Sequence, residues 1–92
     1  MSDRLSAKVT ICNKLGLHAR AATLLAKLAV QYDANVTLKQ GNKTASADSV
    51  LGLLMLESGL GKEVEVIATG PQAQQALTDV CQLIQARFDE AE

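Results

Sequence analysis

Apolar and polar residues alternate with a period of two in three parts of this chain. This alternation predicts strands that have one buried face. One alternating segment, 35–39, and a short, weakly apolar segment, 43–47, flank Gly41 and predict a hairpin, because glycine readily takes the positive φ that a tight turn needs. The residues expected on buried strand faces are Ala7, Val9, Ile11, Val36, Leu38, Val64, Val66 and Ala68.

Two longer segments, 19–32 and 70–88, have apolar residues three and four positions apart, which predicts amphipathic helices. Pro71 suits the first position of the second helix, because that position needs no N–H donor. The acidic tail that follows, residues 89–92, is expected to fray. The expected apolar stripes are Ala21, Leu24, Leu25, Leu28, Ala29 and Tyr32 in the first helix, and Ala73, Ala76, Leu77, Val80, Ile84 and Phe88 in the second.

A third and shorter helix is predicted within residues 48–61. Asp48 or Ser49 can cap its N-terminus, and Gly59 or Gly61 can end it. The full order is then strand, helix, strand, strand, helix, strand, helix. This order is typical of an α+β fold with an antiparallel sheet and helices on one face. With 92 residues and no linker or internal repeat, we expect one domain over residues 1–92.

Composition excludes several classes of function. The net charge is −1 and aromatic residues make up 2% of the chain, so a nucleic-acid-binding surface is not expected. No apolar run approaches the ~20 residues needed to cross a bilayer, so membrane insertion is not expected either. The first ten residues lack the apolar segment of a signal peptide, which indicates a cytoplasmic protein.

The two cysteines, Cys12 and Cys81, predict neither a metal site nor a disulfide. Their spacing with the single histidine, His18, does not match a zinc site, and a reducing cytosol disfavours disulfides. Cys81 falls among helical core positions and is expected to act as a small buried hydrophobe.

His18 lies where a glycine-containing loop meets the first predicted helix, and Arg20 follows two residues later. Unpaired N–H groups at a helix N-terminus carry partial positive charge, which disfavours imidazolium and attracts anions. A guanidinium adds a fork of donors that suits phosphate oxygens. The pair therefore has the groups needed to accept and release a phosphoryl group. The alternative is that His18 is only a polar surface residue.

The stretch KLGLHAR at 14–20 resembles the phosphorylation site of the HPr phosphocarriers. These are small histidine-phosphorylated proteins of the bacterial phosphoenolpyruvate-dependent phosphotransferase system. ASADSVLGLLML at 45–56 resembles the second signature of this family, and GKEVEVIATGP at 61–71 resembles its last strand and the turn into its last helix. The likeness extends over residues 7–88.

The resemblance implies an open-faced β-sandwich of four antiparallel strands covered by three helices. It implies that His18 carries the phosphoryl group on Nδ1, with Arg20 stabilising it. Enzyme I would be the donor and an EIIA domain the acceptor, so the protein would be a covalent carrier without a cofactor rather than an enzyme with free substrates. The family often has proline where this chain has Ala21, and the helix is expected to start nevertheless.

Further residues are implicated by the same resemblance. Ser49 matches a serine that an HPr kinase/phosphorylase modifies in some bacteria, although it can equally be a helix cap. Val50, Leu51 and Leu54 match an exposed apolar docking patch, whereas Leu53 and Met55 are expected in the core. The alternative is that all five apolar residues are core. The full set expected to bind partners is Arg20, Thr23, Lys27, Val50, Leu51 and Leu54.

Several alternatives remain open at the level of sequence. The carrier can belong to the sugar-uptake branch or to the nitrogen-related branch (NPr), and the general HPr type is slightly favoured. A second hypothesis is a regulatory relative that binds partners without carrying phosphate. A hydrolase of the acylphosphatase kind is disfavoured, because NKLGLHAR lacks a glycine-rich phosphate-binding loop. A monomer is the expected oligomeric state.

Overall fold

The computed structural model describes residues 4–92. In this part of the chain, the elements follow the predicted order of strands and helices, and the predicted α+β class is confirmed. They are β1 (Arg4–Thr10), α1 (Ala19–Ala29), β2 (Asn35–Gln40), β3 (Lys43–Ser46), α2 (Val50–Met55), β4 (Glu63–Thr69), α3 (Ala73–Gln85) and a short 3-10 turn, η1 (Arg87–Asp89).

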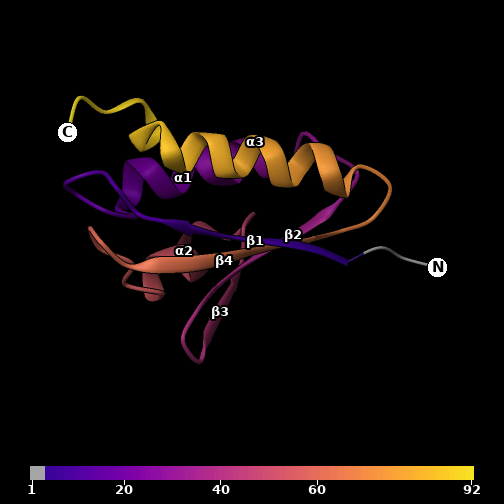
Figure 1. The fold of residues 1–92 in the computed structure, drawn as a ribbon, viewed down its shortest axis with the longest axis horizontal. Helices are drawn as coiled ribbons and strands as arrows, with labels where there is room; N and C mark the ends of the chain where they lie inside the picture. The colour runs from indigo at the N-terminus through magenta and orange to yellow at the C-terminus, as the bar shows by residue number, and fades with distance from the viewer. Residues whose placement is uncertain (1–3) are drawn as a thin grey trace.

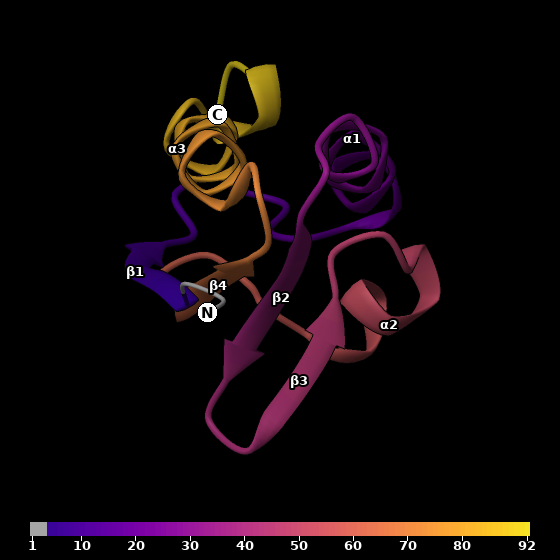
Figure 2. The same cartoon turned by 90° about the vertical axis from the view of Figure 1, so that its right-hand side faces the viewer.

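Within the described residues, the strands form one four-stranded antiparallel sheet in the order β1-β4-β2-β3. The register places Val9 opposite Val64 and Leu38 opposite Val66, so the apolar faces of neighbouring strands coincide. The helices lie on one side of this sheet, with α1 and α3 next to each other and α2 beside β3 (Figures 1 and 2). The opposite face is open, as expected for an open-faced sandwich.

The core between sheet and helices is made largely of the predicted residues. All the expected strand positions are buried except Ala7, which is half-buried. The whole stripe predicted for the last helix is also buried, although Phe88 lies beyond α3, in η1. In α1 the buried line also includes Ala22 and Ala26, whereas Leu24 and Leu28 are half-buried. Small side chains on the inner face let α1 pack close to its neighbours.

Ends of all three helices differ from the prediction, and α3 also stops at Gln85 rather than at residue 88. The first helix stops at Ala29 rather than at residue 32. α2 stops at Met55, before either predicted glycine, because Glu57 takes the left-handed conformation (φ 56°) that ends it. α3 begins at Ala73, so Pro71 lies outside the helix instead of at its first position.

The acidic tail packs against the molecule, so the prediction that residues 89–92 fray is wrong. Arg87, Phe88 and Asp89 all have positive φ values of 52–62°, so the chain leaves the right-handed helical conformation after α3. Phe88 is fully buried in the core and anchors the turn. The backbone N–H of Lys14 then donates to the carbonyl of Glu92 at 2.7 Å, so the tail lies over the loop before α1 (Figure 1).

The cysteines are both free thiols. Cys81 is half-buried rather than buried, and its partial burial raises the pKa of its thiol. The Cys12 thiol donates to the carbonyl of Ile84 at 3.4 Å, which links the end of β1 to the last turn of α3.

Candidate functional site

His18 is the N-cap residue of α1. Its backbone is extended (φ −83°, ψ −178°), and its carbonyl accepts the first helical hydrogen bond from Ala22 N–H at 2.8 Å. Its side chain makes no capping hydrogen bond, so the imidazole is free to take part in other contacts. The N–H groups of the first helical turn therefore remain available to an anion beside the ring.

Gly16 fixes the turn that delivers His18 to this position. It has a φ of +66°, and a Cβ there would lie 2.7 Å from the carbonyl oxygen of Ser58 and 2.8 Å from Cα of Gly59. The next residue, Leu17, donates its N–H to the same Ser58 carbonyl at 2.8 Å. The loop before α1 is thus closely packed on the loop after α2, and only glycine fits at its bend.

Asn13 is a site residue that the sequence did not indicate. Its side chain is fully buried, and its Nδ2 donates to the Gly16 carbonyl at 2.8 Å and to Oε1 of Glu90 at 2.9 Å. The first bond holds the turn before His18, and the second fixes the C-terminal tail. The sequence holds one signal for this role: Asn13 lies three residues before Gly16, and asparagine often supports turns.

Glu90 is the second residue that the sequence did not indicate. Its Oε2 lies 2.5 Å from Nε2 of His18 and 2.9 Å from Nη1 of Arg20. Hydrogen bonds from Asn13 and from His18 lower the pKa of the Glu90 carboxyl, so it is ionised at neutral pH. A carboxylate that accepts from three side chains therefore lies at the centre of the site.

Arg20 lies beside His18, as the sequence suggested, and both residues contact Glu90. Its Nη1 also donates to the Phe88 carbonyl at 3.0 Å, while about half of its side chain (51%) stays exposed. Ala21, which stands where the family often has proline, is fully buried in the first turn of α1. The helix therefore starts without proline, as expected.

The other predicted residues of α1 lie along the helix from Arg20. Thr23 is half-buried, and its hydroxyl donates to the Ala19 carbonyl at 2.8 Å. Lys27 is exposed one turn further on. Because Arg20, Thr23 and Lys27 are spaced three and four positions apart, they share one face of α1.

In α2, Ser49 is the cap, and its Oγ accepts from Gly52 N–H at 3.1 Å. Asp48, the alternative cap, instead accepts a hydrogen bond from Ser46 at 2.6 Å. The choice between the two candidates is thereby settled in favour of Ser49. Its second proposed role, as a phosphorylation site, stays a prediction.

The apolar residues of α2 divide between core and surface. Leu51 is 70% exposed, Val50 and Leu54 are half-buried, and Leu53 is fully buried as expected. Met55 is 66% exposed, so the prediction that it is core is wrong. The buried position belongs instead to Leu56, because the chain leaves α2 at this point and turns inward.

A surface depression of about 510 Å³ surrounds the imidazole. It is lined by groups of both charges and by Leu15, which is 66% exposed. Within residues 4–92, no cluster of three or more histidine, cysteine, aspartate or glutamate side chains is arranged to hold a metal ion. The lining residues are Lys14, Leu15, His18, Arg20, Glu90, Ala91 and Glu92.

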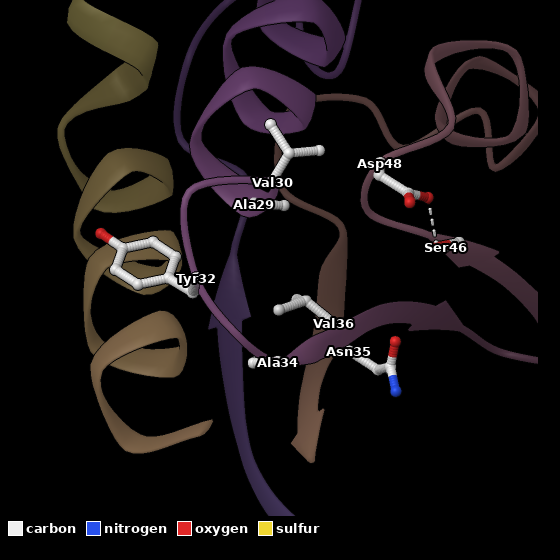
Figure 3. A pocket seen from close by; sticks show the side chains of 8 residues that line it. All are labelled: Ala29, Val30, Tyr32, Ala34, Asn35, Val36, Ser46 and Asp48. Atoms are coloured by element: carbon white, nitrogen blue, oxygen red, sulfur yellow. Dashed lines mark hydrogen bonds between the residues drawn. The ribbon is translucent and has the colours of Figure 1, made fainter. Parts of the chain in front are cut away.

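A second hollow, of about 240 Å³, lies at the other end of α1 (Figure 3). Asp48 and Ser46 are hydrogen-bonded on one side of it, and Val30 and Val36 line it with apolar groups (Figure 3). It contains none of the residues that surround His18.

The described part of the chain contains no helix long and apolar enough to span a membrane.

Known proteins resemble this chain over most of its length. A family model described as PTS HPr component phosphorylation site matches residues 5–86. Phosphocarrier protein NPr of Shewanella violacea is 59% identical over 88 residues, covering 96% of this chain and 97% of the relative. Phosphocarrier protein NPr of Escherichia coli (strain K12) is 49% identical over 83 residues, covering 89% and 92%.

The fold is also found among solved structures. The crystal structure of HPr-C-His from Thermoanaerobacter tengcongensis superposes with a TM-score of 0.91 at 30% sequence identity. The match covers 96% of this chain and 99% of that one. The predicted sandwich of strands and helices is therefore confirmed both by the described elements and by a known structure.

Proposed function

This chain belongs to the HPr family of phosphocarrier proteins, and we propose that it accepts a phosphoryl group on His18 from enzyme I and passes it to an EIIA domain. Phosphocarriers of this system interact in general with enzyme I and with EIIA-type proteins. The observation that carries the proposal is the placement of His18 at the N-terminus of α1, within the matched region, with Arg20 beside it.

The chemistry follows from this placement. The lone pair of Nδ1 attacks the phosphorus atom of the phosphorylated donor, and the bond between phosphorus and the donor breaks, its electron pair leaving with the donor. The first-turn N–H groups of α1 and the guanidinium of Arg20 offset the charge on the phosphoryl oxygens. A second transfer, to the acceptor, regenerates the free imidazole.

The nitrogen-related branch is the better assignment for this carrier. Both of the curated relatives described above are named NPr, the more similar one at 59% identity. This assignment differs from the one that the sequence alone slightly favoured, which was the general HPr type. A regulatory output is then expected rather than sugar uptake.

The proposed docking surface combines the basic face of α1 with the apolar face of α2. Arg20 and Lys27 supply exposed positive charge, and Leu51 is the most exposed large apolar residue of α2. Charged rims around apolar centres are a common form of protein interface. The residues predicted from the sequence are Arg20, Thr23, Lys27, Val50, Leu51 and Leu54, and the exposure of Met55 adds a seventh residue.

Phosphorylation of Ser49 is a second proposal for regulation. The residue caps α2 one position before Val50 and two before Leu51, at the edge of the docking surface. A phosphate dianion there would be tolerated by the helix N-terminus but would repel an acidic partner. A Ser49→Asp variant is expected to receive phosphate from enzyme I more slowly than a Ser49→Ala variant.

The test is intact mass after incubation with phosphoenolpyruvate and each candidate enzyme I. We expect one phosphoryl adduct that mild acid removes and that is absent in His18→Ala. Faster loading by the nitrogen-related enzyme I than by the sugar-type enzyme would support the branch assignment. If no donor modifies the protein, the carrier function is wrong and a purely regulatory binding protein becomes the better reading.

A further inference from the structure

We propose that Glu90 is the positioning residue for His18, accepting the proton of Nε2 and so leaving Nδ1 as the nucleophile. The inference rests on the proposed function, because it explains which ring nitrogen receives the phosphoryl group. It adds a residue from the C-terminal tail to a site that the sequence placed entirely around residues 14–20.

The contact determines the tautomer of the ring. Oε2 of Glu90 lies 2.5 Å from Nε2 of His18. An ionised carboxylate can only accept a hydrogen bond, so Nε2 must supply the proton. A neutral imidazole carries a single N–H, and Nδ1 is then the nitrogen with the free lone pair. Within residues 4–92, Nδ1 has no hydrogen-bond partner, so the lone pair is available for attack.

The carboxylate is itself held in place by groups from three parts of the chain. Oε1 accepts from Asn13 at 2.9 Å, and Oε2 accepts from Arg20 at 2.9 Å. The backbone leading to Glu90 is anchored by the buried ring of Phe88, and the backbone after it is bound to Lys14. The Glu90 side chain is only 14% exposed, which limits competition from water. These contacts orient the acceptor before any donor arrives.

Glu90 also balances charge during the transfer. When Nδ1 forms its bond to phosphorus, the ring becomes positively charged, because the proton on Nε2 stays in place. The adjacent carboxylate stabilises this charge through a charge-assisted hydrogen bond. When the phosphoryl group leaves for the acceptor, the electron pair of the N–P bond returns to Nδ1, and the ring is again neutral with its proton on Nε2.

A blocking role for Glu90, in which it only occupies Arg20, makes a different prediction. Its contact with Arg20 occupies a guanidinium that the proposed function assigns to the phosphoryl group. If Glu90 served only to block Arg20, removing the carboxylate would speed phosphoryl acceptance. If it positions His18, removing it slows acceptance and changes the ring tautomer.

The experiment measures the ring nitrogens of His18 by NMR on the 15N-labelled full chain, at a pH where the imidazole is neutral. Because His18 is the only histidine, its signals need no assignment. We expect the proton on Nε2 in the wild type and a mixture of tautomers in Glu90→Gln and Glu90→Ala. Glu63→Gln removes the same charge from an exposed position on β4, outside the site, and is expected to keep the wild-type spectrum.

The same variants are then tested for the initial rate of phosphoryl acceptance from enzyme I. We expect Glu90→Gln to be slower by about tenfold or more, since the wrong tautomer is costly in hydrolase sites where a carboxylate orients a histidine. Glu63→Gln is expected to match the wild type. Circular dichroism identifies any variant that has lost its fold, and the isosteric Glu90→Gln keeps the test valid if Glu90→Ala does not fold.

The two proposals fail in distinguishable ways. A wild-type ring protonated on Nδ1, or a tautomer that is the same in wild type and Glu90→Gln, would overturn the positioning role. Faster acceptance in Glu90→Gln would also overturn it and favour blocking of Arg20. An Nε2 proton that depends on Glu90, in a protein that takes no phosphoryl group from any donor, would support the positioning role and reject the carrier function alone.

Discussion

Asn13 and Glu90 are joined by a hydrogen bond of 2.9 Å that links the loop after β1 to the C-terminal tail, 77 residues further along the chain. The same Asn13 amide nitrogen donates to the carbonyl of Gly16 at 2.8 Å. One buried amide therefore holds both the turn that delivers His18 and the carboxylate that contacts its ring.

Replacing Asn13 by alanine is expected to destabilise the protein by about 1–3 kcal/mol, because the Gly16 carbonyl and the Glu90 carboxylate lose a buried donor. Urea denaturation measures the change in the free energy of unfolding. Asn35→Ala removes an exposed asparagine on β2 and is the matched control, expected to change stability by less than about 0.5 kcal/mol. Equal effects of the two substitutions would show that the Asn13 contacts contribute nothing.

Gly16→Ala is expected to be strongly unfavourable, by about 1–3 kcal/mol, because it combines a left-handed conformation with a crowded backbone. The added Cβ would lie 2.7 Å from the Ser58 carbonyl oxygen. Gly59→Ala is the control, since its Cβ would meet nothing within 4 Å and its φ is not positive. Thermal unfolding of both variants checks the difference, and comparable melting temperatures would contradict it.

Much of the fold could be predicted from the sequence because its signals are local. Val64, Val66 and Ala68 alternate along β4, and each of them is fully buried. The apolar stripe within α3 is likewise set by spacing along one helix and is buried from Ala73 to Ile84, whereas Phe88 is buried from the turn after the helix. Periodicity works here because each of these elements has one face against a single core.

Helix ends and the tail could not be predicted for a physical reason. Glu57 ends α2 in a conformation that glycine usually takes, and the identity of the residue gives no sign of it. With α2 only six residues long, this single turn decides that Met55 is exposed and Leu56 buried. The role of Glu90 depends on the burial of Phe88 and on contacts with residues more than 70 positions away, which no local pattern contains.

Glu57→Gly is expected to stabilise the protein by about 1 kcal/mol, because a left-handed conformation costs an ordinary residue about 1–2 kcal/mol. The substitution also removes an exposed ion pair with Lys43 at 3.6 Å, but exposed pairs contribute little. Glu57→Ala removes the same ion pair and keeps the strain, so it is expected to be neutral or slightly destabilising. Unfolding in urea compares the two variants. An equal free energy of unfolding for Glu57→Gly and Glu57→Ala would show that the left-handed conformation at residue 57 costs nothing.

Stability at low pH is expected to depend on the hydrogen bond from Tyr32 to Asp79. This bond, together with one from Gln75, lowers the pKa of the Asp79 carboxyl. Its contribution is therefore present above the pKa of an unfolded aspartate and is lost as the pH falls through the lower folded value. The same bond raises the pKa of the Tyr32 hydroxyl, so the contribution is also lost at alkaline pH, above the usual tyrosine range.

The variant that checks this dependence is Tyr32→Phe, which keeps the ring and removes the donor. At neutral pH it is expected to be less stable than the wild type, and the gap should close in strongly acidic and in strongly alkaline solution. The free energy of unfolding is measured across this range for both proteins. If the two proteins differ in the free energy of unfolding by the same amount at every pH, the hydrogen bond from Tyr32 to Asp79 does not cause the pH dependence.

Arg20→Ala is expected to slow phosphoryl transfer by about tenfold to a hundredfold, because each charge-assisted hydrogen bond to phosphate contributes about 1.5–3 kcal/mol. Stopped-flow or rapid-quench measurements with both enzyme I and the EIIA acceptor give the two rates. Lys39→Ala removes the same charge from an exposed position on β2 and is the control. Slowing in both variants would indicate a general effect of charge on encounter, whereas slowing only in Arg20→Ala at saturating partner would show that the guanidinium acts within the site.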